Sequence, residues 1–311
     1  GNSLANKLTG NSAANVLAGS GGNDTLNGGG GNDSLDGGAG NDRMDGGAGN
    51  DTLKGSSGAD TMMGGSGNDR YYVSSSSDVV SETSATGGAD TIVASVGRTL
   101  GAYQEHLTLS GTAVLKGTGN SLANKLTGNV AANVLAGKGG NDTLSGGGGN
   151  DSLDGGTGND RLYGGAGIDT LIGSSGADSL SGNSGNDILR GGTGADRLTG
   201  GSGRDSFRYG SVTESGVASS VRDLITDFVR GEDRINLATI DARAASAGVN
   251  EAFRFIGSNA FSGDASGLLR YTWNASLETG LLQGSTDADS AAEFAIQIVG
   301  ISVLSGADLV L

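Results

Sequence analysis

A single large apolar residue recurs every nine positions through two long stretches of the chain, and mostly Gly, Asn, Asp, Ser and Thr lie between. The first stretch runs from GSGGNDTLN at 19–27 to GGSGNDRYY at 64–72, and the second fills 137–208. Six Gly- and Asn-rich positions favour a tight loop, because Gly adopts positive φ values at little steric cost. The remaining triplet, with its apolar residue at the centre, predicts a very short strand. Each nonapeptide is therefore expected to form half a turn of a coil that has parallel sheets on two sides.

The apolar residues of successive units are expected to stack as one thin core inside this coil. They are Leu26, Leu35, Met44, Leu53, Met62 and Tyr71 in the first stretch, and Leu144, Leu153, Leu162, Leu171, Leu180, Leu189, Leu198 and Phe207 in the second. One apolar residue in nine makes a poor core, because ordering nine residues costs more conformational entropy than burying one Leu side chain returns. The apolar pattern therefore predicts a coil that needs a further source of stability.

That source is expected at the sixth position, where every unit of the two stretches carries Asp. These residues are Asp24, Asp33, Asp42, Asp51, Asp60, Asp69, Asp142, Asp151, Asp160, Asp169, Asp178, Asp187, Asp196 and Asp205. A preference of Asp for turns would explain one such residue, but not a whole set in register. Stacked turns would place these carboxylates about one strand spacing, roughly 4.8 Å, apart, and such an arrangement is repulsive without counter-ions.

A hard dication between the turns would relieve this repulsion by binding carboxylate and Gly carbonyl oxygens together. A site of six or more oxygens with flexible geometry favours Ca²⁺, whereas Mg²⁺ tends to keep its waters. The carbonyl ligands are expected from the fourth position of each unit. These residues are Gly22, Gly31, Gly40, Gly49, Gly58, Gly67, Gly140, Gly149, Gly158, Gly167, Gly176, Gly185, Gly194 and Gly203.

The repeats divide the chain into four parts. A first block at 1–72 is followed by an insert at 73–118, a second block at 119–208 and a region without the repeat at 209–311. Each block opens with two looser units that carry Asn at the sixth position: Asn6, Asn15, Asn124 and Asn133. Residues 1–60 and 119–178 are identical at 52 of 60 positions, so the two blocks are copies of one ancestral unit.

The insert and the last region are also expected to be β-structure. The insert is expected to continue the solenoid irregularly, with strands near 72–73, 78–80, 90–93 and 106–109. The last region is expected to form a β-rich cap, with strands near 223–229, 253–256, 268–273 and 294–299.

Composition narrows the possible functions. The chain has 311 residues, 62 of them Gly, with no Pro, no Cys and one His, His106. The lack of Cys excludes disulfides, thiolate metal sites and thiol nucleophiles, and a single His excludes zinc sites that need two. The formal net charge of −15 argues against a nucleic-acid-binding protein, which needs Lys and Arg to displace counter-ions. The most apolar run, at 294–304, is too short for a transmembrane helix.

The nonapeptides resemble the RTX (repeats-in-toxin) units of secreted Gram-negative proteins, which have the form G-G-x-G-x-D-x-U-x, where U is a large apolar residue. The resemblance implies an all-β fold, a right-handed parallel β-roll, with one Ca²⁺ between the loops of units n and n+2. Applied to the units that carry Asp, it implies roughly ten Ca²⁺ ions in all. The leading units with Asn at the sixth position are expected to be held by Asn hydrogen bonds and to bind little or no calcium.

The region after the repeats resembles the C-terminal module of serralysin-type metalloproteases. The similar segments are Arg204–Phe207, Asp223–Phe228 and Asp233–Leu237. The last residues, Asp308–Leu311, are similar to the end of uncleaved type I secretion signals, and they also suit an edge strand packed on the cap. The resemblance implies the type I secretion machinery as a partner and an extracellular location. A hairpin around Asp287 and Asp289 fits either a solvated turn or one extra Ca²⁺.

The resemblance brings no catalytic residues with it. A serralysin needs an H-E-x-x-H helix and a lipase needs a G-x-S-x-G turn, and neither motif occurs in the sequence. His106 stands at the start of an alternating strand and is expected at the surface. The chain is therefore predicted to be non-catalytic.

Three functions fit the sequence, and the first is favoured: a non-catalytic Ca²⁺-binding domain that folds outside the cell and supports the type I secretion and stability of an exoprotein. The chain starts within the repeat pattern and without Met, so it is expected to be the C-terminal part of a longer protein, such as a protease or lipase. The alternative is a Ca²⁺-dependent cell-surface, surface-layer or adhesin component that self-associates. A carbohydrate-binding module is less favoured, because an acidic surface repels anionic polysaccharide.

Overall fold

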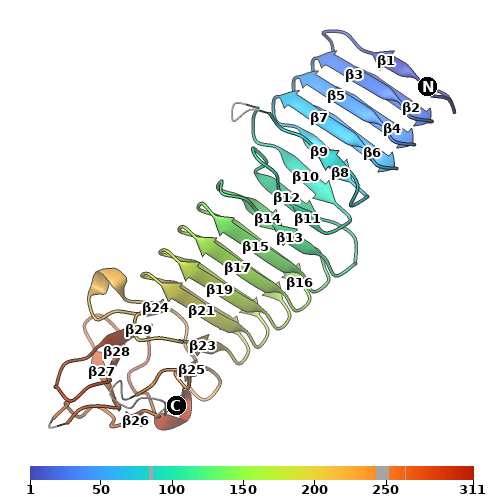
Figure 1. The fold of residues 1–311 in the computed structure, drawn as a ribbon. Helices are drawn as coiled ribbons and strands as arrows, with labels where there is room; N and C mark the ends of the chain where they lie inside the picture. The colour runs from blue at the N-terminus through green and yellow to red at the C-terminus, as the bar shows by residue number, and fades with distance from the viewer. Residues whose placement is uncertain (84–86, 243–251, 263) are drawn as a thin grey trace. The chain divides into compact units, whose positions relative to one another are not determined.

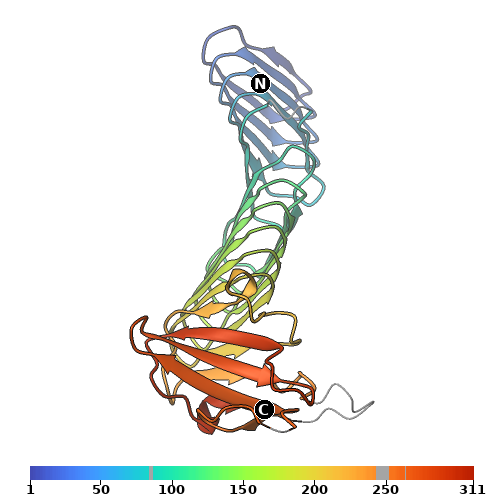
Figure 2. The ribbon, with the colours of Figure 1, turned by 90° about the vertical axis from the view of Figure 1, so that its left-hand side faces the viewer.

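The computed structural model describes residues 1–83, 87–242, 252–262 and 264–311, and nearly all of its regular secondary structure is β-strand. The chain divides into two compact units, Gly1–Thr143 and Leu144–Leu311. In both units the chain winds as a parallel β-solenoid, and most strands pair with the strand two places further along the sequence (Figures 1 and 2). The all-β solenoid that the nonapeptides predict is confirmed.

The first unit carries its strands on opposite faces of the coil. One sheet holds, in order, β1 (Lys7–Thr9), β3 (Thr25–Gly30), β5 (Arg43–Ala48), β7 (Thr61–Ser66) and β9 (Val79–Val80). A second holds β2 (Val16–Gly21), β4 (Ser34–Ala39), β6 (Thr52–Ser57), β8 (Arg70–Val73), β10 (Thr91–Ala94), β12 (His106–Leu109) and β14 (Lys125–Thr127). A third set comprises β11 (Arg98–Thr99), β13 (Lys116–Thr118) and β15 (Val134–Gly139).

The second unit repeats this arrangement and ends in an antiparallel region. One sheet holds β16 (Thr143–Gly148), β18 (Arg161–Ala166), β20 (Ser179–Ser184), β22 (Arg197–Ser202), β24 (Leu224–Ile225), β29 (Phe294–Val299), β28 (Thr279–Ser285), β27 (Leu268–Asn274) and β26 (Arg254–Phe255). The other holds β17 (Ser152–Thr157), β19 (Thr170–Ser175), β21 (Ile188–Thr193), β23 (Ser206–Arg208), β25 (Arg234–Asn236) and β30 (Leu309–Val310). The helical elements of the described residues are two short 3₁₀ turns, η1 (Ser219–Val221) and η2 (Gly306–Asp308), and no helix there is long and apolar enough to span a membrane.

The register of the paired strands stacks the apolar residues on one another. Leu26 lies opposite Met44 in the first unit, and Leu171 lies opposite Leu189 in the second. Each of the fourteen apolar residues predicted for the two cores is at most 1 % exposed. The predicted thin core of one residue per nonapeptide is therefore confirmed.

The strands are longer than the sequence pattern predicts. Strand β3 covers the expected triplet Thr25–Asn27 and continues through the first three glycines of the next unit, to Gly30. These glycines are strand residues because Gly29 and Gly30 pair with Gly47 and Ala48 of the next turn. The expectation that the Gly-rich positions form only loop was wrong. Along each strand, the residues on either side of the apolar residue point outward, as Ser152 and Asp154 do in β17.

The insert continues the solenoid with turns of unequal length. The strands expected near 72–73, 78–80, 90–93 and 106–109 are present as β8, β9, β10 and β12. The regular turn has 18 residues, but Arg70 pairs with Thr91, Thr91 with His106 and His106 with Lys125. The pairing residues are therefore 21, 15 and 19 positions apart. The insert keeps the parallel pairing while it abandons the nine-residue spacing.

The C-terminal part of the second unit joins an antiparallel meander to the last solenoid turns. Strands β27, β28 and β29 pair antiparallel (orange-red to red in Figure 2), and β29 pairs in parallel with β24. Strand β30 forms an edge beside β25, as expected for the last residues. The strand predicted at 223–229 is only two residues long, because the Asp227 carboxylate accepts the N–H groups of Gly200 and Gly201 and breaks the pairing.

Replacing Leu171 by Ala tests the core of the second unit. The side chain is fully buried, so its loss is expected to lower the free energy of unfolding by about 2–5 kcal/mol. The control Leu277→Ala removes a side chain that is 67 % exposed and is expected to change it by less than about 0.5 kcal/mol. Urea unfolding at saturating Ca²⁺ measures both, and equal midpoints would contradict the assigned core.

Candidate metal centres

In each unit the sixth-position aspartates form two files, one at the start of the strands of each sheet. In every file the carboxylate of one turn accepts a hydrogen bond from the backbone of the turn before it. The N–H of Asp24 donates to Oδ1 of Asp42 at 2.7 Å, and the N–H of Asp178 donates to Oδ1 of Asp196 at 2.8 Å. All fourteen aspartates are at most 3 % exposed. The structure therefore brings together the residues that the sequence singled out, as two stacked rows.

The second carboxylate oxygen, Oδ2, lacks a hydrogen-bond donor along most of both files. It is buried and unpaired in Asp24, Asp33, Asp42, Asp51, Asp60, Asp69, Asp169, Asp178, Asp187, Asp196 and Asp205. A buried carboxylate oxygen without a partner is costly, and native proteins almost always satisfy such an atom with a donor, a water or an ion. The repetition of the same unpaired atom in turn after turn indicates a cation.

In several units of both blocks a carbonyl oxygen of the neighbouring turn converges on Oδ2. A Cβ atom added to Gly164 would lie 2.3 Å from Oδ2 of Asp169 and 2.8 Å from the carbonyl oxygen of Gly182. The same cradle recurs at Gly19, where Oδ2 of Asp24 and the carbonyl oxygen of Gly37 lie 2.2 and 2.5 Å from the added atom. The first position of each unit is Gly because these two oxygens fill the space of a side chain. A carboxylate and a carbonyl are the donor set that Ca²⁺ prefers.

The predicted carbonyl ligands at the fourth position lie elsewhere in the loop. All fourteen of these glycines have positive φ. The carbonyl oxygen of Gly158 points at the fourth-position Gly176 of the next turn, 1.8 Å from where its Cβ would be. The first-position carbonyls were not among the predicted ligands. The signal for them was the unbroken run of Gly at the first position in both blocks.

Both files extend beyond the repeats to residues that the sequence reasoning had not assigned as ligands. Asp60 and Asp69 donate their N–H groups to Oδ1 of Asp78 and Asp90, at 3.2 and 2.8 Å. In the second unit, Asp196 donates in the same way to Asp223 at 3.0 Å. Asp205 donates to Asp233 at 2.9 Å. The signal in the sequence was an Asp followed two residues later by an aliphatic residue: Val80, Ile92, Ile225 and Ile235.

Two of these added aspartates end their file with both oxygens satisfied. Oδ2 of Asp78 accepts the N–H groups of Ser74 and Ser75, at 3.1 and 3.0 Å. Oδ2 of Asp233 accepts the N–H of Val229 at 2.7 Å. A file therefore closes where the local backbone supplies donors in place of an ion.

The Asn-containing leading units are held by hydrogen bonds within their own turn, as expected. Oδ1 of Asn6 accepts the N–H of Asn2 at 2.7 Å, and Oδ1 of Asn124 accepts the N–H of Asn120 at 2.7 Å. The amide carries no charge, so these turns stack without the repulsion that the aspartates create.

Burial and mutual repulsion raise the pKa of several carboxyl groups in the files, among them Asp60 in the first unit and Asp196 in the second. Desolvation is the larger cause, and it raises the pKa of Asp178 to about 7 and that of Asp187 to about 6, with Coulombic repulsion from neighbouring aspartates adding to it. In the first unit, desolvation and the carboxylate of Asp90 raise the pKa of Asp69 to about 6. Without a counter-ion, the folded chain therefore resists full ionisation of its own files.

Other polar clusters are less enclosed. Carboxylate oxygens of Asp287, Asp289 and Glu293 lie within 4.8 Å of one another, but both aspartates are exposed. Oδ1 of Asp287 accepts the N–H of Asp289 at 3.0 Å, so the hairpin acids support their own turn. His106 begins β12 and is half-buried, whereas it was expected at the surface.

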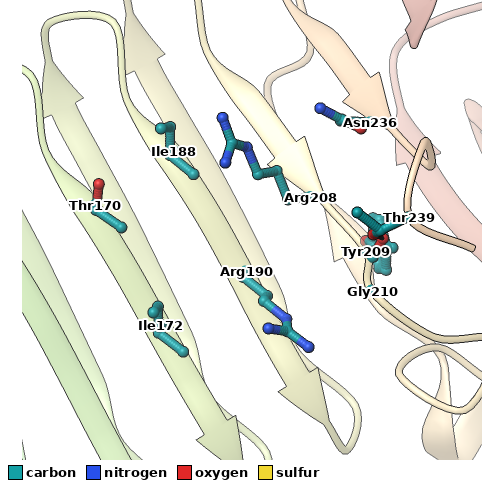
Figure 3. Close-up of a pocket in the computed structure, with 9 residues that line it drawn as sticks. All are labelled: Thr170, Ile172, Ile188, Arg190, Arg208, Tyr209, Gly210, Asn236 and Thr239. Atoms are coloured by element: carbon teal, nitrogen blue, oxygen red, sulfur yellow. Dashed lines mark hydrogen bonds between the residues drawn. The ribbon is translucent and has the colours of Figure 1, made fainter. Parts of the chain in front are cut away.

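A hollow of about 270 Å³ lies on the outer face of β19, β21 and β23 (Figure 3). Two arginines, Arg190 and Arg208, extend beside Ile172 and Ile188 there. Arg190 is paired with the buried Glu214, and the other lining residues include no carboxylate or imidazole that could exchange protons with a substrate. The geometry of this hollow indicates no catalytic centre.

Two family models match the chain. The model described as Peptidase M10 serralysin C terminal matches residues 72–311. The chain belongs to this family. The model described as RTX calcium-binding nonapeptide repeat matches four overlapping segments, at 1–35, 9–44, 36–71 and 45–80. The RTX resemblance is therefore confirmed, the repeats indicate Ca²⁺ binding, and neither matched model is a catalytic domain.

Solved structures of other repeat modules are also similar to this RTX chain. The solution structure of the AlgE6R3 subunit from the Azotobacter vinelandii mannuronan C5-epimerase has 28% sequence identity and a TM-score of 0.37, covering 49% of this chain and 77% of that one. The AlgE6R2 subunit of the same enzyme has 24% identity and a TM-score of 0.35, covering 49% and 89%. No curated protein matches the chain.

Replacing Gly164 by Ala tests the oxygen cradle of the RTX loops. The added methyl group would lie 2.3 Å from Oδ2 of Asp169, so it is expected to weaken Ca²⁺ binding and lower the thermal midpoint. Gly306→Ala is the control, because a Cβ there meets no atom within 4 Å. Calcium titration followed by thermal unfolding measures both variants. Equal calcium dependence of the two midpoints would contradict the cradle.

The raised pKa values predict how pH acts on the metal-free RTX fold. A carboxyl whose pKa is 3.8 in the unfolded chain and about 6 or 7 in the fold favours folding when it is protonated. In EGTA, stability is therefore expected to be greatest below about pH 4 and to fall as the pH rises to about 7. The far-UV β signal in EGTA measures the effect, and it is expected to be largest near pH 4 and to fall toward pH 7, less steeply in Asp178→Asn. A β signal in EGTA that rises with pH would count against the assigned shifts.

Proposed function

We propose that this chain is a non-catalytic RTX domain that folds outside the cell when Ca²⁺ binds, and that it supports the type I secretion and stability of an exoprotein. The observation that carries the proposal is the row of buried, unpaired Oδ2 atoms in both units. At neutral pH, a fold that places the same uncompensated charge in turn after turn needs a cation beside these charges to be stable.

The ligands in this proposal are the fourteen sixth-position aspartates through Oδ2, together with Gly carbonyl oxygens of the loops. The fourth-position glycines remain proposed ligands, and the first-position carbonyls, such as those of Gly37 and Gly182, join them because they converge on Oδ2. When bound, Ca²⁺ supplies positive charge and accepts six to eight oxygens at flexible angles. We infer roughly ten ions, one between the loops of units n and n+2 wherever both carry Asp.

Calcium binding then acts as folding energy. The formal net charge of −15 opposes a compact chain, and ten dications would more than offset it. Extracellular calcium modules bind with affinities of about 10⁻⁴–10⁻³ M, so they are empty in the cytoplasm and filled outside. Because the ions bind the fold and not the extended chain, the equilibrium shifts to the fold only after export.

The last residues support export before folding. Leu309 is buried in β30, and both carboxylate oxygens of Asp308 accept hydrogen bonds from Ser305 or Gly231. In a secretion signal formed by Asp308–Leu311, the first two residues are therefore available to the type I machinery only before the chain folds.

Removal of Ca²⁺ from the RTX chain tests this function. In EGTA the far-UV circular dichroism is expected to lose most of its β signal, and Ca²⁺ in the millimolar range is expected to restore it. A chain with the same β signal and thermal midpoint with and without Ca²⁺ would overturn the proposal.

The variant Asp169→Asn separates the two roles of a file carboxylate. Its side-chain oxygen still accepts the N–H of Asp151, now 2.8 Å away, but the charge is lost. The calcium midpoint of folding is expected to rise severalfold. Asp154→Asn removes an exposed carboxylate in the same block and is expected to leave that midpoint unchanged.

A further inference from the structure

The first turn of the insert departs from the regular loop at one residue. In a regular turn, Oδ2 of a file aspartate and the carbonyl oxygen of a Gly thirteen residues further on lie beside the same first-position Gly. Oδ2 of Asp51 and the carbonyl oxygen of Gly64, for example, both adjoin Gly46. For Asp69 the corresponding residue is Glu82. Around Gly64 the space of the missing Cβ is filled by Oδ2 of Asp69 and by the hydroxyl of Tyr71 instead of a carbonyl. That hydroxyl donates to Oε1 of Glu82.

Three carboxylates gather at this place. One oxygen from each of Asp69, Glu82 and Asp90 lies within 4.8 Å of the other two. Asp69 and Asp90 are 2 % and 1 % exposed, and Glu82 is partly buried. A fourth acid, Glu105, adjoins the cluster by accepting the N–H of Asp90 at 2.9 Å.

The cluster contains an unpaired atom that points to a ligand. Oδ2 of Asp69 is buried and has no donor, and it lies beside the Tyr71 hydroxyl that holds Glu82. Asp51 and Glu105 add further negative charge beside these three acids. The half-buried imidazole of His106 is the basic group that acts on Asp90. Three acids held together at such a distance repel one another unless a cation lies among them.

We propose that Asp69, Glu82 and Asp90 form a separate binding site for a hard divalent cation, with Ca²⁺ as its ion, at the junction between the first RTX block and the insert. The oxygens are spaced as ligands of one ion, because Ca–O distances of about 2.3–2.6 Å allow oxygens up to about 5 Å apart. Tyr71 is a positioning residue that fixes Glu82. The inference rests on the proposed function in one respect: Asp69 is also one of the fourteen aspartates proposed as ligands in the repeat loops.

The junction site differs from the repeat loops in its charge. A repeat site takes Asp carboxylates from two units together with neutral carbonyls, whereas the junction adds a third carboxylate, that of Glu82. Calcium affinity rises with the number of charged ligands. The junction site therefore fills at a lower calcium concentration than the loops.

Terbium luminescence tests the site on the full chain. Tb³⁺ replaces Ca²⁺ at oxygen sites and emits when a nearby tyrosine is excited, and Tyr71 adjoins this cluster. Subtracting the emission of Tyr71→Phe removes the contribution of other aromatic residues. The emission that depends on Tyr71 is expected to be displaced by Ca²⁺, and in Glu82→Gln it is expected to require about tenfold or more Tb³⁺.

The variants keep the local hydrogen bonds. Gln at position 82 keeps an acceptor for the Tyr71 hydroxyl, and Asp90→Asn, a second variant, keeps the acceptor for the N–H of Asp69. Glu232→Gln, at an exposed position of the second unit, is the matched control.

The outcomes separate this site from the repeat loops. Absence of Tyr71-dependent emission, or equal titration of that emission in Glu82→Gln and Glu232→Gln, would overturn the junction site. Circular dichroism of the same samples reports the proposed function independently. A calcium-dependent β signal in all variants, with no effect of Glu82→Gln on the terbium titration, would leave the folding role standing and remove the junction site. A β signal that ignores calcium in every variant would remove the folding role instead.

Discussion

The hydrogen bond from a backbone N–H to the Asp carboxylate one turn further on is the contact on which the rest of this fold depends. It uses one oxygen of each aspartate to join two turns, as Asp169 does for Asp151. The same contact buries the other oxygen where the backbone offers no donor. The same aspartate side chain therefore joins neighbouring turns and creates the need for a cation. The first-position Gly follows from it as well, because the carboxylate of its own unit fills the space of a Cβ.

The apolar core is secondary to this contact. Each regular turn buries two apolar side chains, so most residues of a turn contribute no side chain to the core. Where the files end, the chain replaces the ion by hydrogen bonds. Asn takes the place of Asp in the leading units, and serine N–H groups cap Asp78. Unpaired carboxylates therefore lie inside the blocks, and the files that end at Asp78 and Asp233 close with carboxylates whose oxygens accept local hydrogen bonds.

The nine-residue period was sufficient to predict the solenoid, the identity of the core residues and the two carboxylate files. The period did not predict the features that depend on contacts between stacked turns. The strand character of the Gly-rich positions depends on pairing with the next turn, so a single unit does not reveal it. The aspartates beyond the blocks, such as Asp223 and Asp233, follow their partners by 27 and 28 residues instead of 18, which hides them from a periodic search. Glu82 escaped notice for the same reason, since its neighbours Asp69 and Asp90 are brought to it by a turn of irregular length.

The outward-facing positions beside each apolar residue take part in neither the core nor the files. They already differ from unit to unit, with Asp154, Tyr163, Ile172, Ser181 and Arg190 at equivalent places in five successive units of the second block. Selection can therefore change the outer faces one residue at a time while folding and ion binding stay constant. Each face is a flat lattice of side chains spaced by the width of one strand, about 4.8 Å. A lattice of this kind can evolve toward a new adhesive or enzyme-supporting surface without passing through an unfolded intermediate sequence.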